Sequence, residues 1–154
     1  NRAIEKVINL QGDLPTIDQF ALKEVLNLLD SAEVDIGTLV APFKDFDEMQ
    51  KAQYVKAECH FKSNNTKARA NNFTRIANKE KMENLYHHVG IYSYRREALE
   101  KFVKLKQTNR EKEEKLEQLR AIENNMHIEV SLINSPILGI DTQEDLDNIR
   151  EIQK

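Results

Sequence analysis

The sequence predicts an α/β protein in which helices flank a mostly parallel sheet. A short, continuous apolar run at residues 6–10 is typical of a strand that is covered on both faces. From 17 to 32 the apolar residues recur at helical spacing, and a second strand pattern follows at 34–43, where Pro42 ends it. A strand, a helix and a strand in this order indicate a βαβ unit, the building block of parallel sheets.

Composition limits the classes of protein to which this chain can belong. Its 154 residues are enough for one domain with a core, and 40% hydrophobic and 32% charged residues are typical of a globular protein. A net charge of −3 gives no indication of nucleic-acid binding. Cys59 is the only cysteine, which excludes an internal disulfide and fits a reducing compartment. No apolar stretch is long enough to span a membrane, so we expect a cytoplasmic protein that binds neither nucleic acid nor membrane.

Short patterns predict three further features of the first half of the chain. Thr16 is an N-cap residue type with Gln19 three residues later, which is the spacing of a capping box. The residues from 55 to 61 alternate, with Lys56 on the polar face, so we expect a half-exposed strand near a sheet edge. The polar stretch 62–72 has no periodicity and is predicted to be a loop.

The second half of the chain is expected to continue with strands and helices. Strand patterns occur at 87–95 and 126–133, and helical patterns occur at 96–105 and 109–124. A last helix is expected to begin after the N-cap Thr142 and to run to about residue 152.

Two aspartates lie at the ends of predicted elements, where metal ligands can occur. Asp13 comes directly after the first predicted strand, and Asp141 comes before the last predicted helix. In open α/β sheets, ligands bind outside the carboxyl ends of the strands. Two carboxylates brought together there could hold one Mg²⁺ ion, whose other ligands are waters and phosphates. The alternative for each aspartate is an ordinary turn residue, and spacing alone leaves both interpretations open.

The segment HHVGIYSY, residues 87–94, combines polar side chains with a glycine inside a strand pattern. On a strand, His88, Gly90 and Tyr92 share one face. Gly90 would leave room between two polar side chains for the close approach of a ligand. The alternative is a strand with one solvated face and a glycine at a bulge. His87 is expected to be a loop histidine.

Three more polar residues have both a functional and a structural interpretation. Arg75 could pair bidentately with a carboxylate, and the alternative is a surface arginine. Glu117 and Gln118 lie next to the apolar stripe of the predicted helix 109–124 and could point inward. The charges of this segment are also typical of a solvated helix face, so periodicity does not decide.

Several segments, taken in order, resemble the 3-deoxy-manno-octulosonate (Kdo) cytidylyltransferases, also called CMP-Kdo synthetases. They are VINLQGD, FTR, HHVGIYSYRREALEKFV, EKLEQLR and GIDTQEDLDNIR. Each segment is short, but the ordered set at similar separations is specific to this family. The resemblance covers nearly the whole chain and only the C-terminal part of the family's sequence.

The resemblance implies a Rossmann-like α/β nucleotidyltransferase that usually forms a homodimer. Such an enzyme joins CTP to Kdo, releases pyrophosphate and gives CMP-Kdo for lipopolysaccharide biosynthesis. The match implies that Asp13 and Asp141 are catalytic and bind Mg²⁺. It also implies that a set of polar residues surrounds the Kdo substrate, namely Gln11, Arg75, His88, Tyr92, Glu117 and Gln118.

The chemistry of these residue types agrees with that reaction. A hydroxyl of Kdo would attack the α-phosphorus of CTP, and Mg²⁺ would neutralise the charge on the phosphoryl oxygens and orient the substrates. Arg75 would suit the Kdo carboxylate. The other polar residues would select the sugar hydroxyls, because buried hydrogen-bonding groups reject substrates that lack a partner.

The family pattern also includes segments that this sequence does not contain. The family begins with a strand and a phosphate-binding loop rich in Arg, Ser, Gly, Pro and Lys, and a later segment around SGTDR contributes to cytidine binding. We therefore expect one N-terminally incomplete cytidylyltransferase domain, residues 1–154, that lacks its N-terminal strands and is inactive alone. The open alternatives are a non-catalytic remnant or dimerising fragment of that enzyme and a sialic-acid-type cytidylyltransferase.

Overall fold

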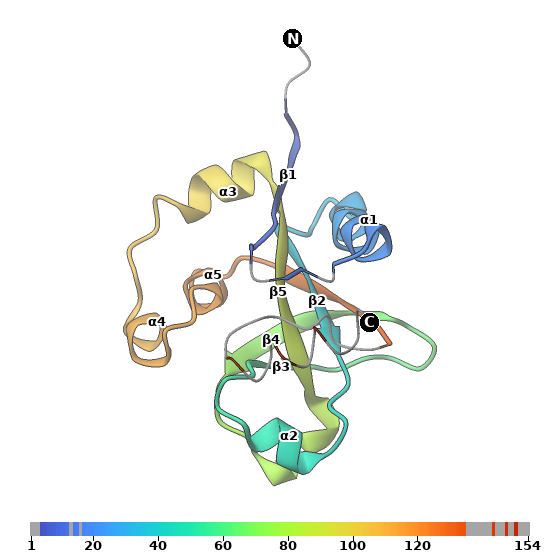
Figure 1. The fold of residues 1–154 in the computed structure, drawn as a ribbon. Helices are drawn as coiled ribbons and strands as arrows, with labels where there is room; N and C mark the ends of the chain where they lie inside the picture. Colours follow the sequence, from blue (N-terminus) through green and yellow to red (C-terminus); the bar gives the residue numbers. More distant parts are fainter. Residues whose placement is uncertain are drawn as a thin grey trace.

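The computed structural model describes residues 4–12, 14–15 and 17–134, together with 143, 147 and 150. Its described strands form one six-stranded sheet in the order β1-β5-β2-β6-β4-β3 (Figure 1). The strands are β1 (Lys6–Asn9), β2 (Ile36–Ala41), β3 (Lys56–Cys59), β4 (Lys67–Thr74), β5 (Leu85–Arg95) and β6 (Ile128–Leu132). Because β3 also pairs with the first residues of β5, the strand order closes into a ring at that end.

The mixed sheet flanked by helices confirms the α/β class, but its pairing is not mostly parallel. β2 and β6 pair in parallel, and every other pair of described strands is antiparallel. β1 and β2 do run in the same direction, as the βαβ pattern predicts, because both pair antiparallel with β5. The local pattern therefore gives the direction of these two strands, whereas β5, from much later in the chain, lies between them.

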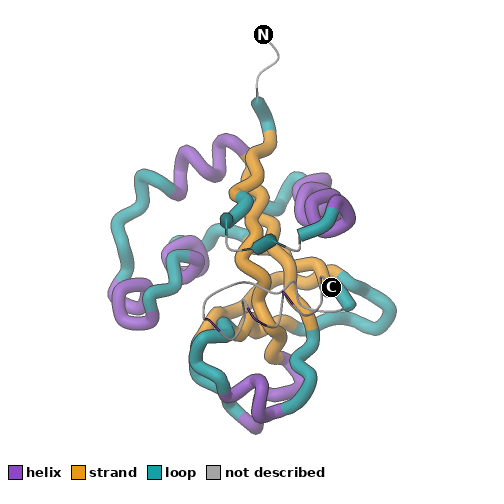
Figure 2. The backbone as a smooth tube through the Cα atoms, in the orientation of Figure 1, coloured by secondary structure: helices purple, strands orange, loops and turns teal. Residues whose placement is uncertain are grey.

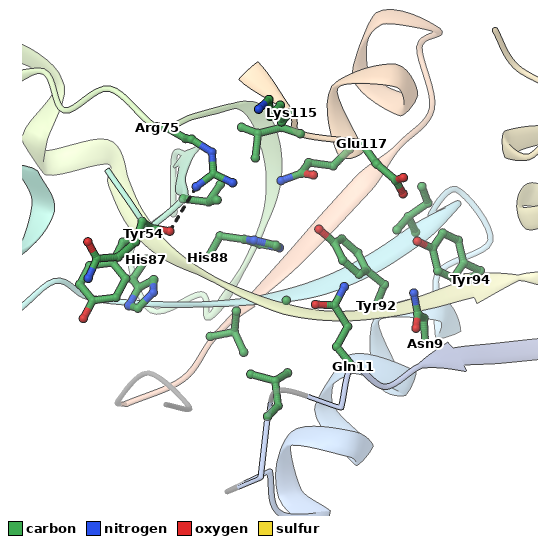
Figure 3. Close-up of a pocket in the computed structure, with 18 of the residues that line it drawn as sticks. Asn9, Gln11, Tyr54, Arg75, His87, His88, Tyr92, Tyr94, Lys115 and Glu117 are labelled. Atoms are coloured by element: carbon green, nitrogen blue, oxygen red, sulfur yellow. Dashed lines mark hydrogen bonds between the residues drawn. The ribbon is translucent and has the colours of Figure 1, made fainter. Parts of the chain in front are cut away.

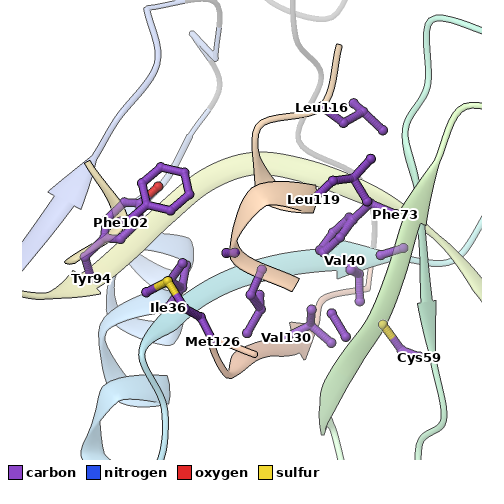
Figure 4. Close-up of a cluster of buried hydrophobic side chains, with 14 of the residues drawn as sticks. Ile36, Val40, Cys59, Phe73, Tyr94, Phe102, Leu116, Leu119, Met126 and Val130 are labelled. Carbon is purple, nitrogen blue, oxygen red and sulfur yellow. The ribbon is translucent and has the colours of Figure 1, made fainter. Parts of the chain in front are cut away.

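Helices cover both faces of the sheet (Figures 1 and 2). They are α1 (Gln19–Asn27), η1 (Leu28–Asp30), α2 (Phe46–Gln50), η2 (Lys79–Asn84), α3 (Arg96–Phe102), α4 (Asn109–Glu114) and α5 (Gln118–Glu123). Val25 of α1 packs in one buried cluster with Leu39 of β2. The next residue of β2, Val40, packs in the other cluster with Leu119 of α5 (Figure 4). The alternation of β2 therefore separates two cores, one on each face.

The first helix begins later than the sequence pattern predicts. The carboxylate of Asp18 accepts a hydrogen bond from the backbone N–H of Ala21 at 2.7 Å, so α1 begins at Gln19 instead of 17. Thr16, the predicted cap, lies outside the described residues. A run of several cap-forming residue types leaves the pattern ambiguous at this point.

The predicted helix 109–124 is divided at Lys115, whose φ of 55° and ψ of 45° are left-handed. Glu111 closes a capping box with Thr108 at the start of α4 and also pairs with Arg120 of α5. In one continuous helix these two charged residues would lie about 13.5 Å apart along the axis. The turn at Lys115 is therefore what brings the two charges together.

The predicted loop 62–72 is wrong in its second half, where β4 begins at Lys67. The inward-facing residues of β4 include Ala68, Ala70 and Phe73, all of them buried. Alanine gives a weak apolar signal, and the two alanines hide the period-two pattern of this strand among polar neighbours.

Lys56 is predicted to be exposed, but its side chain is fully buried. Its ammonium donates to the backbone carbonyls of Lys51 at 2.9 Å, Tyr54 at 2.8 Å and Arg75 at 2.8 Å. All three N–H donors are thereby used. Burial, with the nearby charge of Arg75, lowers the pKa of Lys56.

The predicted last helix falls mostly outside the described residues, its cap Thr142 included, although positions 143, 147 and 150 are helical. Within the part of the chain that is described, no helix is both long enough and apolar enough to cross a membrane.

Candidate functional site

A cavity of about 360 Å³ opens along one edge of β5 (Figure 3). β1 pairs with this edge from Arg95 to Tyr92, and β3 pairs with it from His87 to Leu85. Between these two pairings, no described strand covers this edge of β5. The cavity therefore lies where the sheet leaves a gap, beside the carboxyl end of β1.

The cavity brings together all six residues that the sequence predicts around a substrate. They come from the segment after β1, the residue after β4, the middle of β5 and the start of α5, and they are Gln11, Arg75, His88, Tyr92, Glu117 and Gln118. Their convergence from four separate segments is a property of the fold. Their roles in binding stay predictions.

His88, Gly90 and Tyr92 of β5 form what we call the pocket floor. His88 is only 8% exposed, and its Nε2 lies 3.0 Å from Oγ1 of Thr38 on β2. Burial and the neighbouring His87 lower the pKa of His88 to about 3, so its ring is neutral at physiological pH. Burial, with nearby Tyr94 and Glu117, raises the pKa of Tyr92 far above its ordinary value. The floor is therefore polar but uncharged.

Gly90 provides the space that the sequence predicts at this point, and the amide of Gln11 lies in it. A Cβ added to Gly90 would lie 3.1 Å from Oε1 of Gln11, which is tighter than an ordinary contact. β5 is also bulged here, because Thr38 pairs with Tyr92 and Leu39 pairs with Val89. The bulge of the alternative interpretation is therefore present, and the space beside Gly90 is taken by Gln11, so the close approach of a ligand stays a prediction.

Arg75, Lys115 and Glu117 form what we call the pocket rim, and Arg75 is held in place by the backbone. Its Nη1 donates to the carbonyls of Ala52 at 3.1 Å and Gln53 at 3.3 Å, and its Nε donates to the carbonyl of Glu114 at 3.3 Å. Arg75 thus ties the segment before β3 to the end of α4. Arg75 is half-buried, and these bonds fix its side chain, while its pairing with a carboxylate stays a prediction.

The start of α5 faces the cavity because of the left-handed turn at Lys115. This conformation costs a non-glycine residue about 1 kcal/mol. Lys115 and Glu117, which stands just before α5, line the cavity (Figure 3), and so does Gln118, the first residue of α5. The interpretation of Glu117 and Gln118 as part of a solvated helix face is therefore wrong for Gln118, which is 8% exposed.

Several lining residues are not identified by the sequence patterns: Asn9, Tyr54, His87, Tyr94 and Lys115. His87 is predicted to lie in a loop but belongs to β5, where its ring stacks on Phe43 at 5.3 Å and packs on Tyr54 at 4.6 Å. Burial lowers the pKa of His87 to about 4. Leu85 and Tyr86, which extend the strand pattern toward the N-terminus, are the signal that could have placed it.

The predicted metal ligands Asp13 and Asp141 lie outside the described residues. Among the residues that are described, no group of three or more His, Cys, Asp or Glu side chains is arranged to hold a metal ion. The magnesium site therefore stays a prediction from the sequence.

Comparison with known sequences identifies a family model and several similar proteins. A family model described as cytidylyltransferase matches residues 1–128. A 3-deoxy-manno-octulosonate cytidylyltransferase from Bartonella bacilliformis is 46% identical over 146 residues, which is 95% of this chain and 60% of that protein. Proteins of the same name from Bartonella quintana (46% identical, 98% and 62% covered) and Brucella anthropi (44% identical, 95% and 59% covered) are similar. The chain spans about three fifths of the length of these relatives.

Comparison with solved structures agrees with the sequence. A structure of CMP:2-keto-3-deoxy-manno-octonic acid synthetase complexed with CTP has a TM-score of 0.81 at 27% identity, covering 97% of this chain and 61% of that one. An apo UDP-glucose pyrophosphorylase, at 13% identity and a TM-score of 0.65, shares the fold. The match covers 97% of this chain and 56% of the pyrophosphorylase chain. The resemblance to the CMP-Kdo synthetases is thus confirmed. The chain belongs to the cytidylyltransferase family.

Proposed function

We propose that this chain contributes the sugar-acid site of a CMP-Kdo synthetase, which transfers CMP from CTP to Kdo and releases pyrophosphate. The observation that carries the proposal is the convergence of six predicted side chains on one cavity. The names of relatives at 44–46% identity, and the CTP complex of a similar protein, support this reaction.

The cavity has polar groups that suit a hydroxylated sugar acid. The uncharged floor offers hydrogen bonds to hydroxyl groups, while the rim carries the cations Arg75 and Lys115 and one carboxylate, that of Glu117. Among the described residues, the Lys115 ammonium and Nη2 of Arg75 have no hydrogen-bond partner or ion pair, so both can meet a carboxylate. Floor and rim would together orient Kdo so that one hydroxyl faces the α-phosphorus of CTP.

We also propose that Mg²⁺ binds between Asp13 and Asp141. The support is chemical, because carboxylate oxygens are the ligands that Mg²⁺ prefers, and in the sequence Asp13 stands between Gln11 and Leu14, two residues that line the cavity. When bound, the ion would stabilise the negative charge that develops on the phosphoryl oxygens. A homodimer in the cytoplasm that binds neither nucleic acid nor membrane is part of the same proposal.

Whether the 154-residue chain turns over CTP alone is tested by pyrophosphate release from CTP, Kdo and Mg²⁺. We expect no release, because the family's phosphate-binding loop is not in this sequence. Release by the chain that is lost in Asp141→Asn would contradict this expectation and support the role of Asp141.

The sugar-acid site is tested by titrating Kdo into the chain in a calorimeter. Tyr92→Phe removes one hydroxyl from the floor and should weaken binding about tenfold, the effect of one hydrogen bond. Tyr86→Phe is the matched control, since Tyr86 lies on the same strand but does not line the cavity. Absence of Kdo binding by the unmodified chain, or an equal loss in both variants, would contradict the proposal.

A further inference from the structure

The hydroxyl of Thr38 lies at the bulge of β5, directly behind the pocket floor. Thr38 is fully buried, and its Oγ1 donates toward the backbone carbonyls of Ile91 at 2.7 Å and Val89 at 3.2 Å. The same oxygen lies 3.0 Å from Nε2 of His88. The register shift between Thr38 and Leu39 is what turns these groups of β5 toward one side chain.

Counting protons decides the direction of the bond between Thr38 and His88. A threonine hydroxyl has one proton and two lone pairs. Two carbonyl oxygens, which can only accept, face Oγ1, so its proton points at them and a lone pair points at the imidazole. If Nε2 of His88 carried no proton, Oγ1 would face three acceptors with a single proton. A proton on Nε2, donated to Thr38, is the arrangement that satisfies this count.

We propose that Thr38 is a positioning residue that fixes His88 as the Nε2–H tautomer, so that Nδ1 offers the pocket a hydrogen-bond acceptor. Burial, which lowers the pKa of His88 to about 3, is consistent with one proton on the ring at neutral pH. The ring is packed edge-on against Phe73 at 5.2 Å and lies against Tyr92 at 5.4 Å, which holds its plane. Thr38 does not line the cavity, so it acts only through His88.

This tautomer selects the chemical group that His88 can bind, an inference that rests on the proposed function. A bare Nδ1 accepts a hydrogen bond from a hydroxyl or an amine, and it repels a carboxylate or phosphate that has no hydrogen to donate. His88 therefore reads a sugar hydroxyl. The carboxylate of a sugar acid must then turn away from the floor, toward Arg75 and Lys115 on the rim.

The tautomer is measured without any substrate, from the ¹⁵N chemical shifts of the histidine rings at neutral pH. A His88→Gln variant assigns the signals. The chain should show a protonated Nε2 and a bare Nδ1 at His88, and Thr38→Ser, which keeps the hydroxyl, should show the same. In Thr38→Val the buried Nε2–H has no acceptor, so the proton should move to Nδ1. A bare Nε2 in the unmodified chain, or an unchanged tautomer in Thr38→Val, would overturn the inference. If Thr38→Val does not fold, the first measurement and Thr38→Ser still decide.

Kdo titrations then separate this inference from the proposed function. Where the tautomer changes in Thr38→Val, Kdo should bind about tenfold more weakly, and Thr38→Ser should restore the affinity. A chain with the expected tautomer that does not bind Kdo would refute the proposed function and leave the role of Thr38 intact. A chain that binds Kdo equally well with either tautomer would refute the assignment of His88 as a hydroxyl acceptor.

Discussion

The floor and the rim of the pocket are built by opposite means. The floor belongs to β5, where ladder hydrogen bonds fix the backbone and burial keeps His88 and Tyr92 uncharged. The rim is made of a loop residue, a left-handed turn and a helix start. It is fixed by cations that donate to backbone carbonyls: Lys56 donates to the carbonyl of Arg75, and Arg75 donates to those of Ala52 and Gln53.

The difference indicates a division of labour in recognition. Neutral hydrogen-bonding groups distinguish hydroxyls by direction, and burial strengthens that selection because an unmatched polar group is costly. Charged groups near solvent attract an anion over a longer range but with less directional control. A ligand with many hydroxyls and one carboxylate would use both regions. Changes to the rim should therefore leave the neutral histidine of the floor unaffected.

The largest effect should come from removing the buried ammonium beneath the rim. Lys56→Met leaves the carbonyls of Tyr54 and Arg75 without this donor, while the carbonyl of Lys51 keeps the N–H of Tyr54. We expect a loss of about 3–5 kcal/mol in the free energy of unfolding, measured by urea denaturation, because each buried unsatisfied group costs about 1–3 kcal/mol.

Lys81→Met is the control for this change. Lys81 of η2 pairs at 3.0 Å with Glu58, which lies on β3 as Lys56 does, but the side chain of Lys81 is 54% exposed. Its removal should cost at most about 1 kcal/mol, as for other exposed ion pairs. Equal stabilities of the two variants would show that Lys56 does not hold the rim.

A smaller effect should follow from breaking the ion pair that joins α4 to α5. Glu111 accepts from Arg120, Gln107 and the backbone of Thr108, and it is nearly fully buried. Glu111→Gln should lower the free energy of unfolding by about 2 kcal/mol, because hydrogen bonds to charged groups are stronger. Glu100→Gln, which removes an exposed pair with Arg96, should cost less than about 0.5 kcal/mol.

The acid dependence of stability gives a second readout for Glu111. The bond from Arg120 is the first cause that lowers the pKa of Glu111 below 4.5 in the folded protein. A carboxyl with a depressed folded pKa stabilises the protein above its unfolded pKa, and this stabilisation is lost as the pH falls through the folded pKa. The unmodified chain should therefore lose more stability than Glu111→Gln below about pH 4.5. If the free energy of unfolding fell equally with pH in the two proteins, the Glu111–Arg120 pair would not contribute to stability as proposed.

The two regions also differ in how well the sequence predicts them. β5 has a strong strand pattern, and an alternating strand dictates that His88, Gly90 and Tyr92 share a face. The rim depends on tertiary contacts that leave no local pattern. Lys56 looks solvent-exposed because its acceptors are backbone carbonyls, those of Lys51, Tyr54 and Arg75, which leave no signal in a side-chain pattern. Lys115 looks helical because the residues on both sides of it continue the helical pattern, although Glu111 and Arg120 pair across the turn.

The family resemblance predicts six of the residues that line the cavity, and only the structure gives their geometry. Gln11, Arg75 and Glu117 have no periodicity that separates them from surface residues. Thr38 was not identified at all, since a threonine in a strand is the ordinary choice for a β-branched residue. Its partners are set by a bulge that shifts the register of β5 by two residues, which no local pattern reveals.

The smallest and most selective change is Lys115→Asn, which removes one charge from the rim and leaves the floor intact. Asparagine tolerates the left-handed conformation better than lysine, so stability should be unchanged or slightly higher, while the rim loses one cation. Kdo binding should weaken by about threefold at low salt, the value of an exposed charge pair, and the difference should shrink as salt is added. Lys106→Asn, in the loop before α4 and away from the cavity, should bind as the unmodified chain does. A loss of Kdo affinity that persists at high salt would show that Lys115 makes a direct hydrogen bond instead of acting through its charge. The rim would then select ligands by hydrogen-bond direction, as the floor does.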